Sequence, residues 1–228
     1  MHIRNWMALA HDVAAAALAS CWLAARCKSM GVTAPLLLFI IESTLRWKEG
    51  KRLAWLPITA MAAILIGSLV VWSLGLLPGA TFGVVESISG ELWGAGVHAL
   101  TEARAFVVYW LLLILPLPGW LCIDHDFALS RTLWHHGAIF ALLLHAALLA
   151  LAIRFAIRGP RLTAIGILWF YVTLSPYAVI PHVEVLVEYK TYMPCIGFFM
   201  IVADLLHALR HVMPRRGQVA IVAASAVL

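Results

Sequence analysis

Two short polar segments of an otherwise apolar chain carry the residue types that bind phosphates and divalent metals. Residues 123–132 include Asp124, His125, Asp126 and Arg131, and residues 181–192 include His182, Glu184, Glu188, Lys190 and Tyr192. Carboxylates and imidazoles can hold a divalent cation, for which the sequence offers Asp124 and Asp126. Basic side chains at a membrane edge can hold a lipid phosphate, for which it offers Lys190 and Arg131. The alternative is that both segments are solvated loops. The sequence identifies no catalytic residue, and no cofactor is established beyond this candidate divalent metal.

The ten histidines form a second set of candidates. His135, His136, His145 and His207 lie on or beside expected helices, and histidines on facing helices can ligate haem. His207 and His211 are four residues apart, which places them on one helix face, as a metal pair would require. The alternative, which we favour, is that these histidines form local hydrogen bonds or lie at the membrane interface.

Charged residues and cysteines within apolar stretches form a third set. Asp12, Glu42 and Asp204 lie in or near apolar runs, where a charge is costly and faces protein or water. A proton relay is one interpretation, and a polar contact between packed helices is the one we favour. Cys122 and Cys195 both fall beside the two polar segments, so a disulfide between them is chemically allowed in an oxidising compartment.

The composition determines the class of protein in which these residues operate. Of the 228 residues, 64% are hydrophobic and only 12% are charged. This excludes a soluble globular domain, a disordered chain and a disulfide-stapled secreted domain, and it predicts a polytopic membrane protein. The net charge of +5 is typical of basic cytoplasmic loops rather than of nucleic-acid binding.

The apolar runs predict the helices that would position these groups. We expect an all-α, polytopic transmembrane bundle of about seven helices plus a partial eighth, forming a single domain over residues 1–228. The runs cover residues 6–26, 31–45, 53–77, 104–122, 133–153, 162–180, 193–210 and 219–228. The last run is too short to cross a bilayer. Either the natural protein continues beyond it or this segment inserts only partly, and we favour a longer protein.

The distribution of arginines predicts which loops share a side of the membrane. The short basic loops 154–161 and 209–216 are expected in the cytoplasm. Loops 123–132 and 181–192 then lie together on the outer face. The basic loop 46–52 does not fit this count, and the topology of residues 31–103 stays open.

Three segments, in order, resemble one family of membrane enzymes. The first is Lys28–Leu38, which is followed by Glu42. The second is Tyr109–Pro116, which continues through Cys122–Phe127 and Ser130. The third is Glu188–Pro194, which is followed by Gly197-Phe198. They resemble the membrane portion of bacterial tetratricopeptide-repeat O-mannosyltransferases, within the lipid-linked-sugar (GT-C) glycosyltransferases. The chain departs from the family pattern at Ser29, Tyr189 and Lys190, and the acidic catalytic loop of that family has no counterpart in it.

The resemblance implies the C-terminal part of a GT-C membrane module, which transfers sugar from a polyprenyl-phosphate carrier to protein. In such a module Lys190 and Arg131 would hold the lipid phosphate, while Asp124, Asp126 and Glu188 would order the outer loops or bind a metal. We expect the chain not to be catalytically competent alone. The alternative is a non-catalytic integral subunit that acts as scaffold in a larger membrane complex. Its expected partners are membrane lipids, a polyprenyl-phosphate sugar or other membrane subunits, and its expected location is the bacterial inner membrane.

Overall fold

The structure is a computed structural model, and it describes residues 33–48, 95–120, 125–179 and 185–212, together with 16, 19–21, 23, 24, 31 and 122. These residues are predominantly helical. The α-helices are α2 (Ala34–Lys48), α5 (Ala95–Ile114), α6 (Ala138–Arg158), α7 (Arg161–Val179) and α8 (Pro194–Val212). Two short 3₁₀ helices, η2 (His135–Gly137) and η3 (Glu188–Thr191), precede α6 and α8.

The predicted bundle of seven spanning helices plus a partial eighth is wrong for the part of the chain that can be described. Among the helices that the structure describes, only Gly96–Ile114 and His135–Arg158 are long and apolar enough to cross a membrane. The helix α2, with 15 residues, is shorter than the roughly 20 that a bilayer requires. The helix α7 begins at an arginine, and α8 carries Asp204, His207 and Arg210 in its second half. The predicted runs 53–77 and 219–228 lie outside the described residues, as does most of 6–26.

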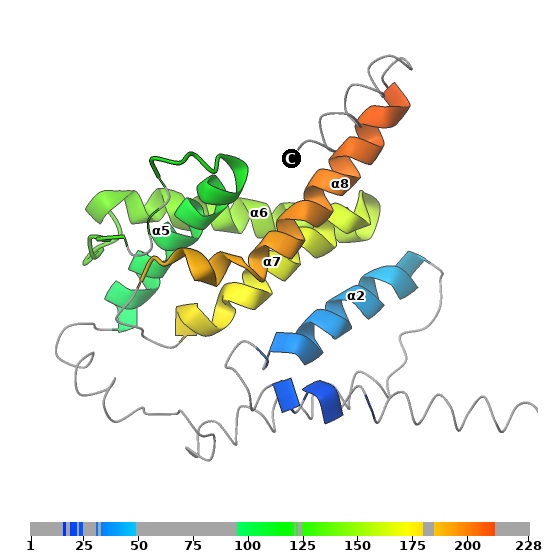
Figure 1. The fold of residues 1–228 in the computed structure, drawn as a ribbon, viewed down its shortest axis with the longest axis horizontal. Coiled ribbons are helices and arrows are strands. Elements are labelled where there is room, and N and C mark those ends of the chain that lie inside the picture. Colours follow the sequence, from blue (N-terminus) through cyan, green and yellow to red (C-terminus); the bar gives the residue numbers. More distant parts are fainter. Residues whose placement is uncertain are drawn as a thin grey trace, which may run out of the picture.

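The helix α7 lies at the centre of the described helices (Figure 1), packed against α8, α6, α2 and α5. Its closest approach is to α8, where Gly166 faces Gly197. A methyl group built on either glycine would overlap the backbone carbonyl oxygen of the other. Small residues allow two helix backbones to approach this closely in apolar surroundings.

Proline and glycine set the helix ends near the polar segments. The helix α5 stops at Ile114, before Pro116, whose ring supplies no amide hydrogen to continue the helix. The helix α8 starts at Pro194, the first-turn position where proline is tolerated. At the start of α6, His136 and Gly137 have φ angles of 53° and 73°, so the chain reverses there in the left-handed region.

An aromatic and aliphatic core joins α5 to α7 and to the loop before η3. Tyr109 and Phe170 have no exposed surface, and Leu186 is 2% exposed. Trp110 stacks on Phe170, with ring centroids 4.1 Å apart. This core holds the loop from Val185 onward against α5, and the same loop carries several of the predicted functional residues.

Candidate functional site

The two polar segments lie against each other in the structure, as their predicted common face requires. His125 and Leu186 form an isolated antiparallel bridge, in which the His125 amide donates to the Leu186 carbonyl at 3.3 Å. The Cys122 amide donates to Glu188 Oε1 at 2.5 Å. His125 Nε2 lies 3.6 Å from the same carboxylate oxygen. Residues more than sixty positions apart therefore form one continuous surface.

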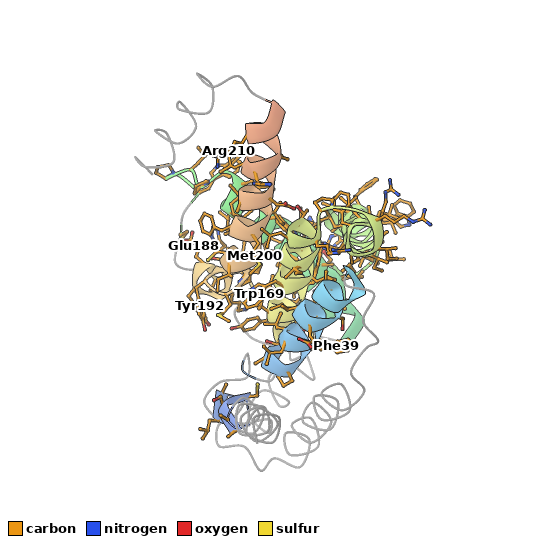
Figure 2. The ribbon with its side chains drawn as sticks, turned by 90° about the vertical axis from the view of Figure 1, so that its right-hand side faces the viewer. Phe39, Trp169, Glu188, Tyr192, Met200 and Arg210 are labelled. Atoms are coloured by element: carbon orange, nitrogen blue, oxygen red, sulfur yellow. The ribbon has the colours of Figure 1, made fainter. Side chains whose placement is uncertain are left out.

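The predicted site residues divide between this surface and the interior. Asp126, Arg131 and Tyr192 are exposed, and His125 and Glu188 are half-buried. Glu188 and Tyr192 lie on the same side of the molecule, away from Arg210 at the far end of α8 (Figure 2). Asp124, His182 and Glu184 lie outside the described residues, so their predicted roles, including the metal role of Asp124, stay predictions. Among the residues that are described, no group of three His, Cys, Asp or Glu side chains could hold a metal ion.

Lys190 points into the protein, with no exposed surface. Its ammonium donates to the Val185 carbonyl oxygen at 3.1 Å and lies 4.7 Å from the centroid of the Tyr177 ring. Burial, followed by the neighbouring phenols of Tyr189 and Tyr192, raises the pKa of Tyr177 to about 12, so that its ring is neutral. A neutral aromatic face attracts a desolvated ammonium. These contacts favour an internal role for Lys190, and its predicted contact with a lipid phosphate stays untested.

Glu102 supplies the opposite charge in the same buried region. It lies on α5 with 1% of its surface exposed, and it interacts electrostatically with Lys190. Neither of its carboxylate oxygens makes a hydrogen bond in the part of the chain that is described. Ionisable side chains at membrane depth generally face the protein interior and pair with one another. Glu102 and Lys190 interact electrostatically in this interior, without a hydrogen bond between them.

Three further buried side chains surround this pair. His98 Nε2 lies 3.1 Å from the Tyr177 carbonyl oxygen. The Tyr109 hydroxyl donates to the Val185 carbonyl and accepts from the Val187 amide, at 3.1 and 3.2 Å. We refer to His98, Glu102, Tyr109, Tyr177 and Lys190 as the buried polar cluster. It hydrogen-bonds the backbone of residues 185–187 and so fixes the loop that presents Glu188.

The sequence contains a signal for this cluster that the prediction did not use. His98, Glu102 and Tyr109 are spaced by four and seven residues, which places them on one face of a helix. The predicted helix began at residue 104, so Glu102 was assigned to a polar stretch outside it. The helix in fact begins at Ala95 and includes all three residues.

Histidine, aspartate and cysteine candidates within the described helices have structural partners. His145 Nε2 lies 2.7 Å from the Ala103 carbonyl and Nδ1 lies 2.8 Å from the Tyr171 hydroxyl, which occupies both ring nitrogens. This confirms the local hydrogen bonding that we favoured over haem ligation for this residue. Asp204 Oδ2 accepts from the Thr163 amide at 3.0 Å and from its hydroxyl at 2.5 Å, so its helix-packing role is also confirmed. No disulfide joins Cys122 to Cys195. Asp12 lies outside the described residues.

The contact between Asp204 and Thr163 also shows which ends of α7 and α8 lie together. It places the second half of α8 beside the start of α7, which is the end at which Arg158 and Arg161 lie. Arg210, in the last turns of α8, therefore lies toward the same end as Arg158 and Arg161. The surface that contains His125 and Glu188 forms at the other end, where α8 begins and α7 ends.

No protein-family model, curated protein or solved structure matches this chain.

Proposed function

We propose that this chain is an integral membrane subunit of the bacterial inner membrane. Its helices act as a scaffold that fixes a polar loop surface at one face of the membrane. The observation that supports this proposal best is the outward face of α6. Phe140, Leu143 and Ile153 are 69%, 59% and 57% exposed on it, whereas Ala141 and Ala152 of the same helix are buried. Large exposed apolar side chains on a helix of this length are stable in contact with lipid tails or with another apolar helix.

The buried polar cluster gives the scaffold its defined shape. Lys190 and Tyr109 both donate hydrogen bonds to the Val185 carbonyl, and Glu188 accepts a hydrogen bond from the Cys122 amide. A buried charge pair is weak support for stability, but it can select one arrangement of packed elements over others. In this chain the selected arrangement is the one that brings the two polar loops together.

Photo-crosslinking in intact membranes tests the proposal. A photoreactive phenylalanine analogue at Ile153 probes the outward face, and the same analogue at Trp134, which is 78% exposed and precedes α6, is the matched control. We expect one recurring protein partner from position 153 and a weaker or different pattern from position 134. Adducts with lipid alone would refute the subunit role while retaining membrane insertion. Extraction of the chain by alkaline carbonate would refute both.

A second candidate function is the lipid-linked-sugar transfer that the family resemblance implies. The specific observation in its favour is that the second and third resembling segments, distant in sequence, meet where the Cys122 amide donates a hydrogen bond to Glu188 Oε1. Incubation of the full chain with a polyprenyl-phosphate-linked sugar and a Ser/Thr-containing acceptor peptide tests it. Transfer that Glu188→Gln abolishes and Asp204→Asn preserves would support it. Because we expect the chain not to be competent alone, the same incubation is repeated with membranes that contain the native protein, and the absence of Glu188-dependent transfer there would refute this candidate function.

A further inference from the structure

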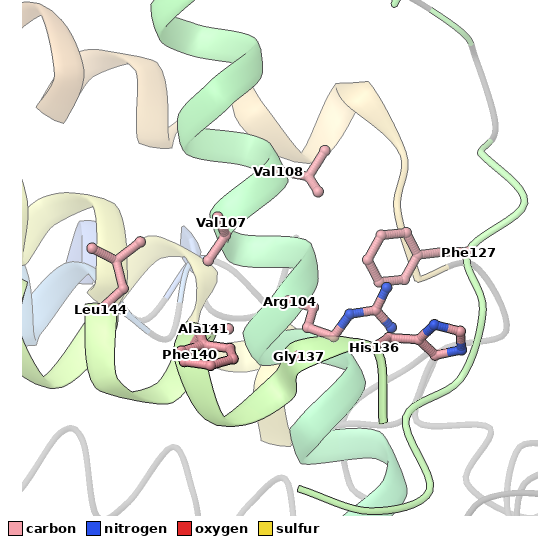
Figure 3. Close-up of a pocket in the computed structure, with 9 residues that line it drawn as sticks. All are labelled: Arg104, Val107, Val108, Phe127, His136, Gly137, Phe140, Ala141 and Leu144. Carbon is pink, nitrogen blue, oxygen red and sulfur yellow. The ribbon is translucent and has the colours of Figure 1, made fainter. Parts of the chain in front are cut away.

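A groove of about 310 Å³ lies between α5 and the start of α6, separate from the buried polar cluster. Figure 3 shows that basic side chains lie at one end of the groove and apolar side chains along the rest of it. Arg104 and His136 lie with Phe127 at one end, and Val107, Phe140 and Leu144 line the rest. A concave site with an apolar body and a few convergent polar groups is the usual form of a small-molecule site.

The polar end of the groove carries positive charge that no acidic side chain of the described residues neutralises. Arg104 Nη1 donates to the Ala128 carbonyl at 2.7 Å and to the Ser130 hydroxyl at 2.8 Å, both of which are neutral acceptors. Its guanidinium lies 4.6 Å from the centroid of the Phe127 ring. The His136 imidazole lines the same end of the groove. One guanidinium with a neutral imidazole beside it, and no carboxylate of the described residues paired with either, forms a site complementary to an anion. Arginine matches the geometry of a phosphate well, and an imidazole N–H can donate a further hydrogen bond to it.

The apolar body of the groove opens onto the outward face of α6. Phe140 and Leu144, which line the groove, are also 69% and 43% exposed. The polar end, in contrast, lies beside η2, which precedes the first turn of α6. If α6 crosses the bilayer, its end lies at the headgroup layer and its outward face meets the lipid tails. The groove would then carry its charge at headgroup level and its apolar side chains along the tails.

We propose that this groove binds one anionic phospholipid. Its phosphate is held by Arg104 and His136, and the first part of one acyl chain lies along Val107, Phe140 and Leu144. A free phosphate ion would use only the polar end, so the apolar continuation favours a lipid. The inference rests on the proposed membrane placement of α6, but it does not depend on the chain being a subunit of a complex.

Native mass spectrometry of the full chain, delipidated in mild detergent, provides the test. The probes are phosphatidylglycerol, phosphatidylcholine with the same acyl chains, and inorganic phosphate. We expect one retained phosphatidylglycerol, bound more tightly than phosphatidylcholine, and no displacement by phosphate at millimolar concentration. Equal retention of both lipids would refute the charge-based site, and displacement by inorganic phosphate would show a simple anion site instead.

Variants assign the binding to the groove. Arg104→Gln should weaken phosphatidylglycerol binding roughly fivefold, the effect of one basic residue near an anionic headgroup. Arg158→Gln, which removes an exposed positive charge at the far end of α6, is the matched control and should change nothing. Leu144→Trp leaves Arg104 intact and fills the apolar body, so it should also displace the lipid. Ser130→Ala removes one Arg104 hydrogen bond but no charge, and it should retain the lipid. Unchanged binding in both Arg104→Gln and Leu144→Trp would overturn the proposal, as would an equal loss in Arg158→Gln.

Discussion

The buried Glu102–Lys190 pair makes a quantitative prediction about stability. Lys190→Met removes the ammonium that lies near Glu102 and leaves the carboxyl group in a site where it is 1% exposed and has no hydrogen-bond partner among the described residues. Removal of one partner of a buried ion pair costs about 3–5 kcal/mol. Because Glu102 makes no hydrogen bond to Lys190 and can take up a proton once the ammonium is gone, we expect a loss at the lower end of this range, about 3 kcal/mol. At about 2–4 °C per kcal/mol for a chain of this size, the midpoint of thermal unfolding should fall by roughly 10 °C.

The partner substitution should cost less. In Glu102→Gln the Lys190 ammonium retains the Val185 carbonyl at 3.1 Å and the Tyr177 ring at 4.7 Å, both of which stabilise a positive charge. We expect a loss of about 1–3 kcal/mol, the usual penalty for an altered buried polar contact. The double variant Glu102→Gln/Lys190→Met buries no charge at this site, so it should be more stable than Lys190→Met alone.

The assay is thermal unfolding of the full chain in one detergent, followed by circular dichroism for all four members of the cycle. Arg158→Met, which removes an exposed cation at the end of α6, is the matched control and should shift the free energy of unfolding by no more than about 0.5 kcal/mol. The coupling energy between the two sites should be about 1–3 kcal/mol. Strict additivity of the two single losses would show that Glu102 and Lys190 do not act as a pair, and the reasoning would fail.

Three further predictions concern the contacts that position the site. Gly166→Ala should destabilise the chain by about 1–3 kcal/mol, because the new methyl group overlaps the α8 backbone. The control is Gly96→Ala, whose methyl group meets no atom within 4 Å. It should be neutral or slightly stabilising in the same unfolding assay. Asp204→Ala should cost about 2–3 kcal/mol because it removes two hydrogen bonds from Thr163, and Asp204→Asn should recover part of this; equal losses would contradict the role of the acceptor oxygen. His145→Phe should cost about 1–3 kcal/mol, and a matching loss in Tyr171→Phe that is not additive with it would confirm the hydrogen bond between them.

The bounds of a helix could be predicted where an arginine or a proline borders the apolar run. The predicted helices 162–180 and 193–210 correspond closely to α7 and α8, because Arg161 and Pro194 mark their first turns. The prediction of 104–122 was displaced relative to α5. Its start was placed too late because Glu102 was counted with the more polar stretch before residue 104, although its burial is compatible with a helix. Its end was placed too late because the apolar residues continue past Ile114, where Pro116 already prevents further helix formation.

The meeting of the two polar loops was predictable for a topological reason. The helices between them run in opposite directions, so the loops at the end of α5 and at the end of α7 share one end of the packed helices. The close contact of Gly166 with Gly197 was not predictable in the same way. Single glycines on two helices carry no spacing pattern within either helix, and their opposition depends on the register of α7 against α8.

Lys190 shows that the sequence alone does not determine which residue of a loop faces the protein interior. The residues Glu188–Thr191 form a 3₁₀ turn, in which successive side chains point about 120° apart. One of the consecutive residues must therefore face the packed helices while its neighbours face outward. Lys190 is buried, whereas Tyr189 is 54% exposed. Glu102 on α5 favours the arrangement in which the inward residue is the lysine, because its carboxyl group would otherwise be buried without a counter-charge. The chemistry available on the outer surface is thus determined by a residue of a distant helix, and substitution of Glu102 should alter the environment of Glu188 as well as that of Lys190.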